Sequence, residues 1–280
     1  MRIKKHPNQN DYVLTKNNLW VRNFTKDQVP YVNINRTIKE QDHFLYLKNE
    51  YYCEQERLPW IDAEKIYYER VIIISDGFNF KEKQKLLAKI PNNIALLGTN
   101  GALNKWQIPQ RSLTYYVVNN PYEDCMAYLP RKNFNLPKCI TSTRTNAKFL
   151  SHYRGLKYRY IPVNEEVYSG LSYKETEYRI DDYRNPICAA LNLAYQFGAE
   201  KILLFCCDSV FNEDRPGAIL LKNKKWMYPQ QTTVNYLLDG MAYWLKNKAY
   251  GKVLVKDCSS GPEYENIEYI DEDNLLSFLE

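Results

Sequence analysis

The feature that most constrains this chain is the apolar run of residues 71–74, Val-Ile-Ile-Ile, which the mainly polar residues 75–79 follow at once. The β-branched residues favour a strand, and the Lys-rich amphipathic segment behind the turn favours a helix. Ligands of open parallel sheets bind beyond the carboxyl ends of the strands, where helix N-termini present unpaired N–H groups to anions. We therefore expect a ligand site at residues 75–79, with a plain strand-to-helix connection as the alternative.

Length and composition are typical of a globular protein. The chain has 280 residues, 45% of them hydrophobic, so it can bury a full core. No apolar stretch approaches the roughly 20 residues that cross a bilayer, and no apolar segment follows the basic N-terminal residues. The seven cysteines are odd in number and form no Cys-x-x-Cys pair. We expect a cytoplasmic protein without a membrane span, with reduced cysteines in its core.

The charge suits an anionic ligand better than a nucleic acid. The net charge of +5 comes from 38 Lys and Arg against 33 Asp and Glu. Basic runs such as residues 222–225 are short, and the 25 tyrosines lack the spacing of RNA-binding motifs. We therefore expect no nucleic-acid partner. The abundance of Asn, Lys and Tyr suits an AT-rich genome, cellular or viral.

Two regions differ in pattern. Residues 1–68 are rich in aromatic groups and show no sustained hydrophobic period, which predicts an N-terminal extension or arm. We expect this arm to pack on the main domain or on a partner subunit. Residues 69–280 alternate between strand and helix patterns, and such alternation predicts an α/β domain with an open, mostly parallel sheet and helices on both faces.

The predicted elements follow one another closely. The predicted strands cover residues 71–74, 94–97, 113–118, 138–141, 158–161, 201–207 and 253–255. The predicted helices cover residues 81–89, 146–153, 186–197, 234–245 and 271–278, with a shorter one ending near residue 106. The best-defined helix begins at Asn185-Pro186, an N-cap residue followed by proline, and ends at Gly198. Each of the earlier strands ends in a polar turn, as a ligand-facing edge requires.

Four blocks of this chain resemble a known family, in the family's order. Residues 71–81 resemble the strand and Gly-x-Gly-Pro-Ser-Leu turn of the 6-hydroxymethylpterin diphosphokinase MptE-like proteins and of the bacterial lipo-oligosaccharide sialyltransferases. Residues 97–103 and 116–121 are similar to their second and third strand-turn units. Residues 185–208 resemble the following helix and the signature Gly-x-x-x-Ile-x-Leu-x-Gly-x-Asp. The blocks together cover about residues 70–210.

The resemblance implies a Rossmann-like fold that holds a nucleotide, with donor phosphates over the first turn. Gly77 and Asn79 would cradle phosphate through backbone N–H groups and a side-chain amide, and later Asn residues would contact sugar or base. The predicted nucleotide-binding residues are Ser75, Asp76, Gly77, Asn79, Asn100, Asn119, Asn120, Asn185 and Ser209. Asp208 would close the site from the opposite side.

The chain departs from the family pattern in its first turn. Ser75 stands in place of the first Gly, Phe78 in place of Pro and Asn79 in place of Ser. Asp76 adds a carboxylate, which repels a phosphate about 4 Å away by about 4 kcal/mol at an effective dielectric constant near 20. Asp76 therefore either points away from the phosphate or helps to hold a cation.

Two further departures concern chemistry. No acidic cluster follows the third predicted strand, where Asn119-Asn120-Pro121 stand, and this disfavours the Mg²⁺-dependent kinase branch. The His that serves as general base in the sialyltransferase branch is absent from the region after Asp208. Asp208 is our predicted catalytic base, and Glu213 and Asp214 are the alternatives, unless they belong to a plain surface loop.

Three functions remain open at this point. Our prediction is a glycosyltransferase-like protein that takes a sugar from a nucleotide-sugar donor. It requires no cofactor, and a divalent metal is an open alternative that no residue pattern supports. The first alternative is a pterin diphosphokinase-like transferase, which should need a divalent metal. The second is a catalytically inactive structural or assembly protein that forms a homo-oligomer through residues 1–68.

Overall fold

The structure is a computed structural model of the chain. It describes residues 12–14, 20–22, 45–63, 66–77, 80–130, 135–162, 179–182, 185–207, 210–211, 219–220, 226–229, 252–259 and 267–280. The helix predicted over residues 234–245 lies outside the described residues. The same is true of three predicted site residues, Asn79, Asp208 and Ser209.

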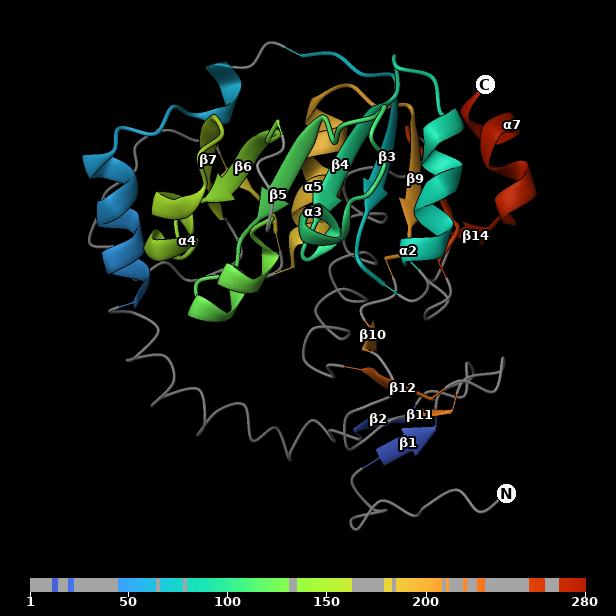
Figure 1. Ribbon diagram of the computed structural model, residues 1–280, viewed down its shortest axis with the longest axis horizontal. Helices are drawn as coiled ribbons and strands as arrows, with labels where there is room; N and C mark the ends of the chain where they lie inside the picture. Colours follow the sequence, from blue (N-terminus) through green and yellow to red (C-terminus); the bar gives the residue numbers. More distant parts are fainter. Residues whose placement is uncertain are drawn as a thin grey trace.

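Within the described residues, nine strands form one central sheet in the spatial order β14-β13-β9-β3-β4-β5-β6-β7-β8 (Figure 1). Every neighbouring pair in this sheet is parallel. The strands are β3 (Arg70–Ile74), β4 (Ala95–Thr99), β5 (Tyr115–Val118), β6 (Lys138–Ser142), β7 (Lys157–Pro162), β8 (Arg179–Ile180), β9 (Lys201–Phe205), β13 (Leu254–Asp257) and β14 (Glu268–Tyr269). The predicted open parallel α/β sheet is confirmed, and the fold is Rossmann-like.

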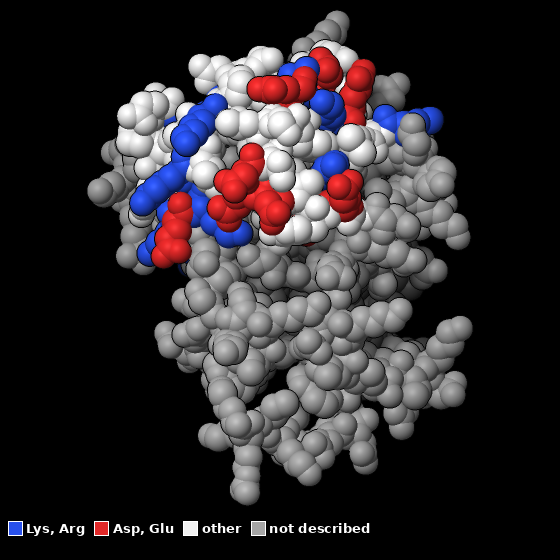
Figure 2. All heavy atoms as spheres, turned by 90° about the vertical axis from the view of Figure 1, so that its right-hand side faces the viewer, with Lys and Arg blue, Asp and Glu red and all other residues white. Residues whose placement is uncertain are grey.

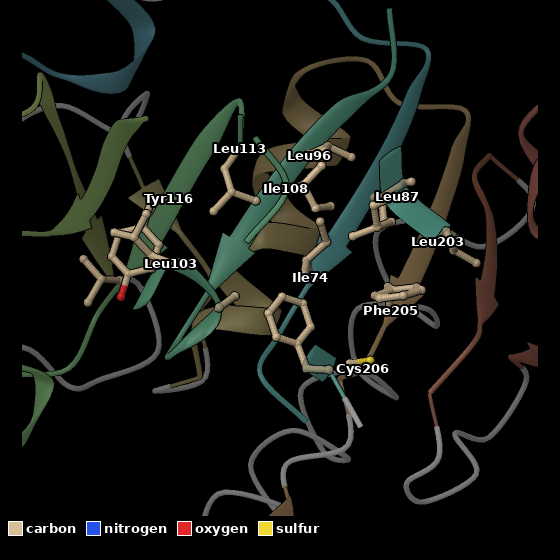
Figure 3. Packing of buried hydrophobic residues seen from close by; sticks show 14 of the residues in the cluster. Ile74, Leu87, Leu96, Leu103, Ile108, Leu113, Tyr116, Leu203, Phe205 and Cys206 are labelled. Carbon is tan, nitrogen blue, oxygen red and sulfur yellow. The ribbon is translucent and has the colours of Figure 1, made fainter. Parts of the chain in front are cut away.

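The seven strands predicted from the sequence are all present, with bounds shifted by a few residues. Two strands of the central sheet were not predicted, β8 and β14, because each has two residues and so shows no hydrophobic period. Along each longer strand, alternate side chains point to opposite faces of the sheet. Ile74, Leu96 and Phe205 pack on one face (Figure 3), whereas Val71 and Ile73 pack on the other.

Helical segments cover both faces, as predicted. The first face carries a helix whose described part covers residues 45–55, together with α2 (Phe80–Lys83), η3 (Gln84–Lys89), α3 (Ala102–Lys105), η4 (Glu123–Tyr128), α4 (Ala147–His152) and α7 (Leu275–Leu279). The second face carries α5 (Pro186–Gln196), which packs behind β3, β4 and β5. Nine consecutive residues at the start of α5 are buried, so this helix lies inside the molecule rather than on its surface.

Both ends of α5 form as the sequence predicts. The side chain of Asn185 accepts a hydrogen bond from the N–H of Ile187, and Pro186 takes the first helical position, where no N–H is needed. At the other end, Gly198 has a φ of +82°, and its N–H donates to the carbonyl of Tyr195. The N–H of Ala199 donates to the carbonyl of Ala194, which completes a Schellman motif.

The segment after β3 differs from its prediction. The sequence predicts one helix over residues 81–89, but α2 is a single α-helical turn and η3 continues it as a 3₁₀ helix. Tertiary bonds hold this tighter form, because the buried Gln84 side chain donates to the carbonyl of Lys105 and accepts from the N–H of Gln107. The helix ends at Ile90, since the residue before Pro91 favours an extended backbone.

Smaller elements complete the described structure. One pair of strands is antiparallel, β1 (Tyr12–Leu14) with β2 (Trp20–Arg22). A three-stranded sheet has the order β10-β12-β11, from β10 (Val210–Phe211), β11 (Ile219–Leu220) and β12 (Trp226–Pro229). Short 3₁₀ turns are η2 (Ile61–Ala63) and η6 (Glu272–Asn274). In the part of the chain that the structure describes, every helix is too short or too polar to cross a membrane.

The end of the sheet near α2, β14 and α7 carries charges of both signs (Figure 2). Two ion pairs lie there, Lys83 with Glu272 at 2.9 Å and Lys256 with Glu268 at 3.1 Å. All seven cysteines are buried thiols outside any disulfide, as the sequence predicts for core residues.

Candidate functional site

The connections between strands reverse direction beside β3. From β3 the chain moves through β4 to β8 on one side, whereas β9 lies on the other side of β3 and leads to β13 and β14. The boundary between β3 and β9 is therefore a topological switch point. In open α/β sheets, ligands bind in the crevice outside the carboxyl ends of the strands at this point. The turn of residues 75–77 lies directly at it.

Backbone hydrogen bonds join this turn to the end of β9. The N–H of Ser75 donates to the carbonyl of Phe205 at 3.1 Å, and the N–H of Gly77 donates to the carbonyl of Cys206 at 3.0 Å. The N–H of Gly77, which the resemblance assigns to phosphate, thus has a protein partner in this structure. The role of Gly77 in phosphate binding stays a prediction, and it requires this N–H to leave the carbonyl of Cys206 or to be shared with it.

Two residues at this edge have a left-handed backbone. Asn100 follows β4 with a φ of +49°, and Cys206 follows β9 with a φ of +53°. Asn adopts this conformation readily, but Cys carries the steric cost of a Cβ. In the signature that residues 198–208 resemble, the position of Cys206 is a Gly. Non-glycine residues with such backbone strain concentrate at functional sites, so Cys206 supports the location of a site at the end of β9.

The strain at Cys206 predicts that a Gly variant is more stable than an Ala variant, the reverse of the order inside a helix. We expect Cys206→Gly to be more stable than Cys206→Ala by about 1 kcal/mol in urea unfolding, because Gly avoids the left-handed penalty. The matched control is Cys188, which is equally buried but lies inside α5. At that helical position the free energy of unfolding of Cys188→Ala should be about 1 kcal/mol higher than that of Cys188→Gly. The same order at both positions would contradict the strain at Cys206.

Side chains also link the ends of β3 and β4. The amide Nδ2 of Asn100 donates to Oγ of the buried Ser75 at 3.3 Å. The hydroxyl of Thr99 donates to the carbonyl of Ile74 at 3.2 Å, and the hydroxyl of Tyr116 donates to the carbonyl of Asn100 at 2.8 Å. The structure therefore brings Ser75 and Asn100 together, as expected for two residues of one site.

The carboxylate of Asp76 is paired with a cation. Nζ of Lys105, the last residue of α3, lies 2.7 Å from Oδ2 of Asp76 and also donates to its carbonyl at 3.3 Å. A Cβ on Gly101 would lie 2.3 Å from Oδ2 of Asp76, so the absence of a side chain at Gly101 leaves room for the carboxylate. Of the two expectations for Asp76, the structure shows contact with a cation, and that cation is a side chain.

A polar strip continues from this ion pair toward the end of β5. Burial, followed by the negative charges of Asp76 and Asp124, raises the pKa of Tyr128 to about 12. Asn120 forms a local turn in which Oδ1 accepts from the N–H of Tyr122, and Nδ2 donates to the carboxylate of Asp124. Asn120 therefore stabilises the loop after β5, and its predicted contact with a nucleotide stays a prediction.

Asn119 and Asn185 belong to a second, buried group. Nδ2 of Asn119 donates to Oδ2 of Asp182 at 3.1 Å, and the hydroxyl of Tyr160 donates to the same oxygen at 3.0 Å. The N–H of Asn185 donates to the carbonyl of Asp182 at 2.8 Å. Burial, with a further contribution from Asp182, raises the pKa of Tyr160 well above its ordinary value. This group ties the ends of β5 and β7 to the start of α5.

The end of β6 is covered by the helix over residues 45–55 (blue in Figure 1). Residues 141–146, Thr-Ser-Thr-Arg-Thr-Asn, are all buried although all are polar. Nδ2 of Asn49 donates to the carbonyl of Arg144 at 2.8 Å, and Oδ1 of Asn49 accepts from the N–H of Ala147 at 3.0 Å. Because this helix covers the end of β6, the switch point between β3 and β9 remains the better candidate for a ligand.

The structure thus separates the predicted residues into groups. Ser75, Asp76, Gly77 and Asn100 meet at the ends of β3 and β4, whereas Asn119 and Asn185 meet in the buried group around Asp182. Sequence reasoning missed the partners Lys105, Asp182 and Tyr128, because no local pattern marks them. Within the described part of the chain, no three His, Cys, Asp or Glu side chains gather as metal ligands would.

Comparisons with known proteins bear on the fold. No protein-family model matches the chain, and no curated protein matches it. Among solved structures, the chain is similar to the MAf glycosyltransferase from Magnetospirillum magneticum AMB-1, with a TM-score of 0.62 and 13% sequence identity. The match covers 83% of this chain and 38% of the glycosyltransferase chain. At this level of identity the likeness shows the fold: both chains contain an α/β domain of the Rossmann-like type.

Proposed function

We propose that this chain is a glycosyltransferase-like protein that binds a nucleotide-sugar donor at the carboxyl ends of β3, β4 and β9. The observation that carries the proposal is the topological switch point between β3 and β9, where the polar turn of residues 75–77 meets the strained end of β9. The likeness in fold to a glycosyltransferase supports the same assignment. This chain spans 38% of that protein's length, so its donor and acceptor are open.

The proposed roles follow the order of the edge. Ser75, Asp76, Gly77 and Asn79 would face the phosphate, Asn100 would approach the sugar or base, and Ser209, which follows β9 in the sequence, would contact the nucleotide. Asn119 or Asn120 would also contact the sugar or base, and Asn185 would add the positive dipole end of a helix N-terminus. In this arrangement a neutral ion pair beside the phosphate favours binding more than an isolated Asp76 carboxylate would.

Asp208 is the proposed base. It follows Cys206 by two residues, and chain connectivity alone keeps their Cα atoms within about 8 Å. In the proposed reaction, Asp208 accepts the proton of an acceptor hydroxyl while the acceptor oxygen bonds to the anomeric carbon. The bond from that carbon to the donor's phosphate oxygen breaks, and the nucleotide leaves with the electron pair. No metal or other cofactor takes part in the proposal.

The test is a calorimetric titration with CMP-, UDP- and GDP-sugars. We expect at least one of them to bind the unsubstituted chain, and Gly77→Trp to weaken that binding at least tenfold, because the indole would fill the space over the turn. Lys89→Trp, at an exposed position ending η3, is the control and should bind normally. Absence of binding, or equal binding by Gly77→Trp, would remove the proposal.

Further assays on the same protein distinguish the two alternative functions. Turnover of a pterin alcohol that requires ATP and Mg²⁺ would favour the diphosphokinase-like function. Absence of nucleotide binding, together with a changed oligomeric state after deletion of residues 1–44, would favour an assembly protein. The deletion stops before residue 45 because the next residues bond to the turn after β6 and to β7.

A further inference from the structure

We propose that Lys105 is a phosphate-binding residue of the donor site and that Asp76 and Gly101 fix its position; this inference rests on the proposed function. Sequence patterns do not mark Lys105, which lies 29 residues after Asp76 in the chain. The fold nevertheless brings its ammonium group onto the turn where the donor's phosphate is proposed to bind.

The position of the ammonium group is well defined. Two atoms of one residue accept from it, Oδ2 and the carbonyl oxygen of Asp76, at 2.7 and 3.3 Å. An ammonium group has three donors, so one remains after these two bonds. Among the described residues, Nζ has no further partner. The Lys105 side chain is 39% exposed, so a ligand can reach it from solvent.

The local backbone is shaped for this arrangement. Gly101 begins the turn into α3 with an ordinary negative φ of −77°, so backbone freedom does not explain the glycine. What explains it is space, because a Cβ at Gly101 would collide with the Asp76 carboxylate at 2.3 Å. Thus Gly101 leaves the carboxylate its place, and the carboxylate holds the ammonium against the turn.

Three other cations of the described structure are held by carboxylates away from this turn. Arg144 pairs with Glu50, and Arg159 pairs with Glu54 while stacking on the Trp60 ring. Lys83 pairs with Glu272 near the end of β13. Lys105, by contrast, contacts the first turn itself, through the carbonyl and the carboxylate of Asp76. A side chain already held by Asp76 also loses less conformational freedom on binding than a mobile lysine would.

The experiment is a titration of the full chain, with EDTA present, using the CMP-, UDP- or GDP-sugar that the unsubstituted chain binds best. We expect Lys105→Met to weaken binding about tenfold to thirtyfold, because a charge-assisted bond to phosphate is lost. Gly101→Ala should weaken binding severalfold, although it keeps the lysine, because it displaces the carboxylate. Lys148→Met removes a comparable cation paired with Glu123 elsewhere and should bind normally.

The outcomes distinguish the two proposals. If the unsubstituted chain binds no nucleotide-sugar, the proposed function fails, and this inference fails with it. If the unsubstituted chain binds and Lys105→Met binds equally well, this inference alone is overturned. Thermal unfolding of each variant excludes a loss of fold as the cause, and Lys105→Gln repeats the test with a polar side chain. An unchanged affinity in Gly101→Ala would overturn the positioning role of Gly101.

Discussion

The chain should lose a large part of its stability between pH 7 and pH 10 under reducing conditions. Burial raises the pKa of Cys53 and Cys125 to about 12 and that of Cys258 to about 11, from an ordinary value of 9.0. Burial also raises the pKa of Cys139 and Cys188. Each thiol therefore keeps its proton in the folded chain at a pH where the unfolded chain loses it.

The sign of this effect follows from proton linkage. Below pH 9 both states bind the thiol protons, and the contribution to stability is fully present. Above pH 9 the folded state binds more protons than the unfolded state, so stability falls as pH rises. Between pH 7 and pH 10, each thiol lowers the free energy of unfolding by about 1.4 kcal/mol, and the five together lower it by about 7 kcal/mol. That sum is comparable with the whole stability of a domain, about 5–15 kcal/mol.

Urea unfolding at pH 7, 9 and 10 measures the effect. Cys188→Ala is the internal control, because its loss between pH 7 and pH 10 should be smaller by one thiol's share, about 1.4 kcal/mol. The substitution also removes packing contacts, but their contribution to the free energy of unfolding is the same at both pH values and cancels in the difference. Above pH 10 the buried Tyr116, Tyr153 and Tyr160, whose pKa values burial also raises, should steepen the loss. Equal stability at pH 7 and pH 10 would contradict the prediction.

Arg144→Met should lower the free energy of unfolding by about 3–5 kcal/mol, because it leaves a buried carboxylate without its cation. Nε of Arg144 lies 3.4 Å from Oε1 of Glu50, and their side chains are 8% and 2% exposed. The guanidinium group also lies 5.0 Å from the centre of the Tyr46 ring. The pair joins the helix over residues 45–55 to the turn after β6.

A double substitution tests whether the loss comes from the unpaired charge of Glu50. The double substitution Arg144→Met with Glu50→Leu should recover most of the loss, because an apolar pair of similar size needs no charge compensation. Lys148→Met breaks an exposed pair with Glu123 and should change stability by less than about 1 kcal/mol. Urea unfolding measures all three variants. Arg144→Met with normal stability would show that the pair does not hold this helix on the sheet.

The helix over residues 45–55 shows where a sequence pattern fails. The residues that it buries against the turn after β6 include Asn49, Glu50 and Cys53. Two of these are polar, so the hydrophobic period that identifies most helices is absent, and the sequence predicted only an extension or arm over residues 1–68, without a helix in it. By contrast α5 was predicted closely, because its cap, its proline, its apolar face and its terminal glycine all lie within one short segment.

The candidate site divides in the same way. The polar turn after β3 and the residue after β4 were identified from the sequence, because each directly follows a recognisable strand. The partner of Asp76 was not identified. Its ion pair with Lys105 and the contact of Asn119 with Asp182 join residues 29 and 63 positions apart.

By itself, then, the amino-acid sequence determined the longer strands of the central sheet, the parallel α/β class and the edge on which a ligand is expected. These depend on hydrophobic period and turn chemistry, which act over a few neighbouring residues. Only the tertiary structure decided that β3 and β9 adjoin, that Lys105 neutralises Asp76 and that a polar helix covers the end of β6. Polar pairs between distant segments carry no local period, since their stability depends on geometry that exists only after the sheet has assembled.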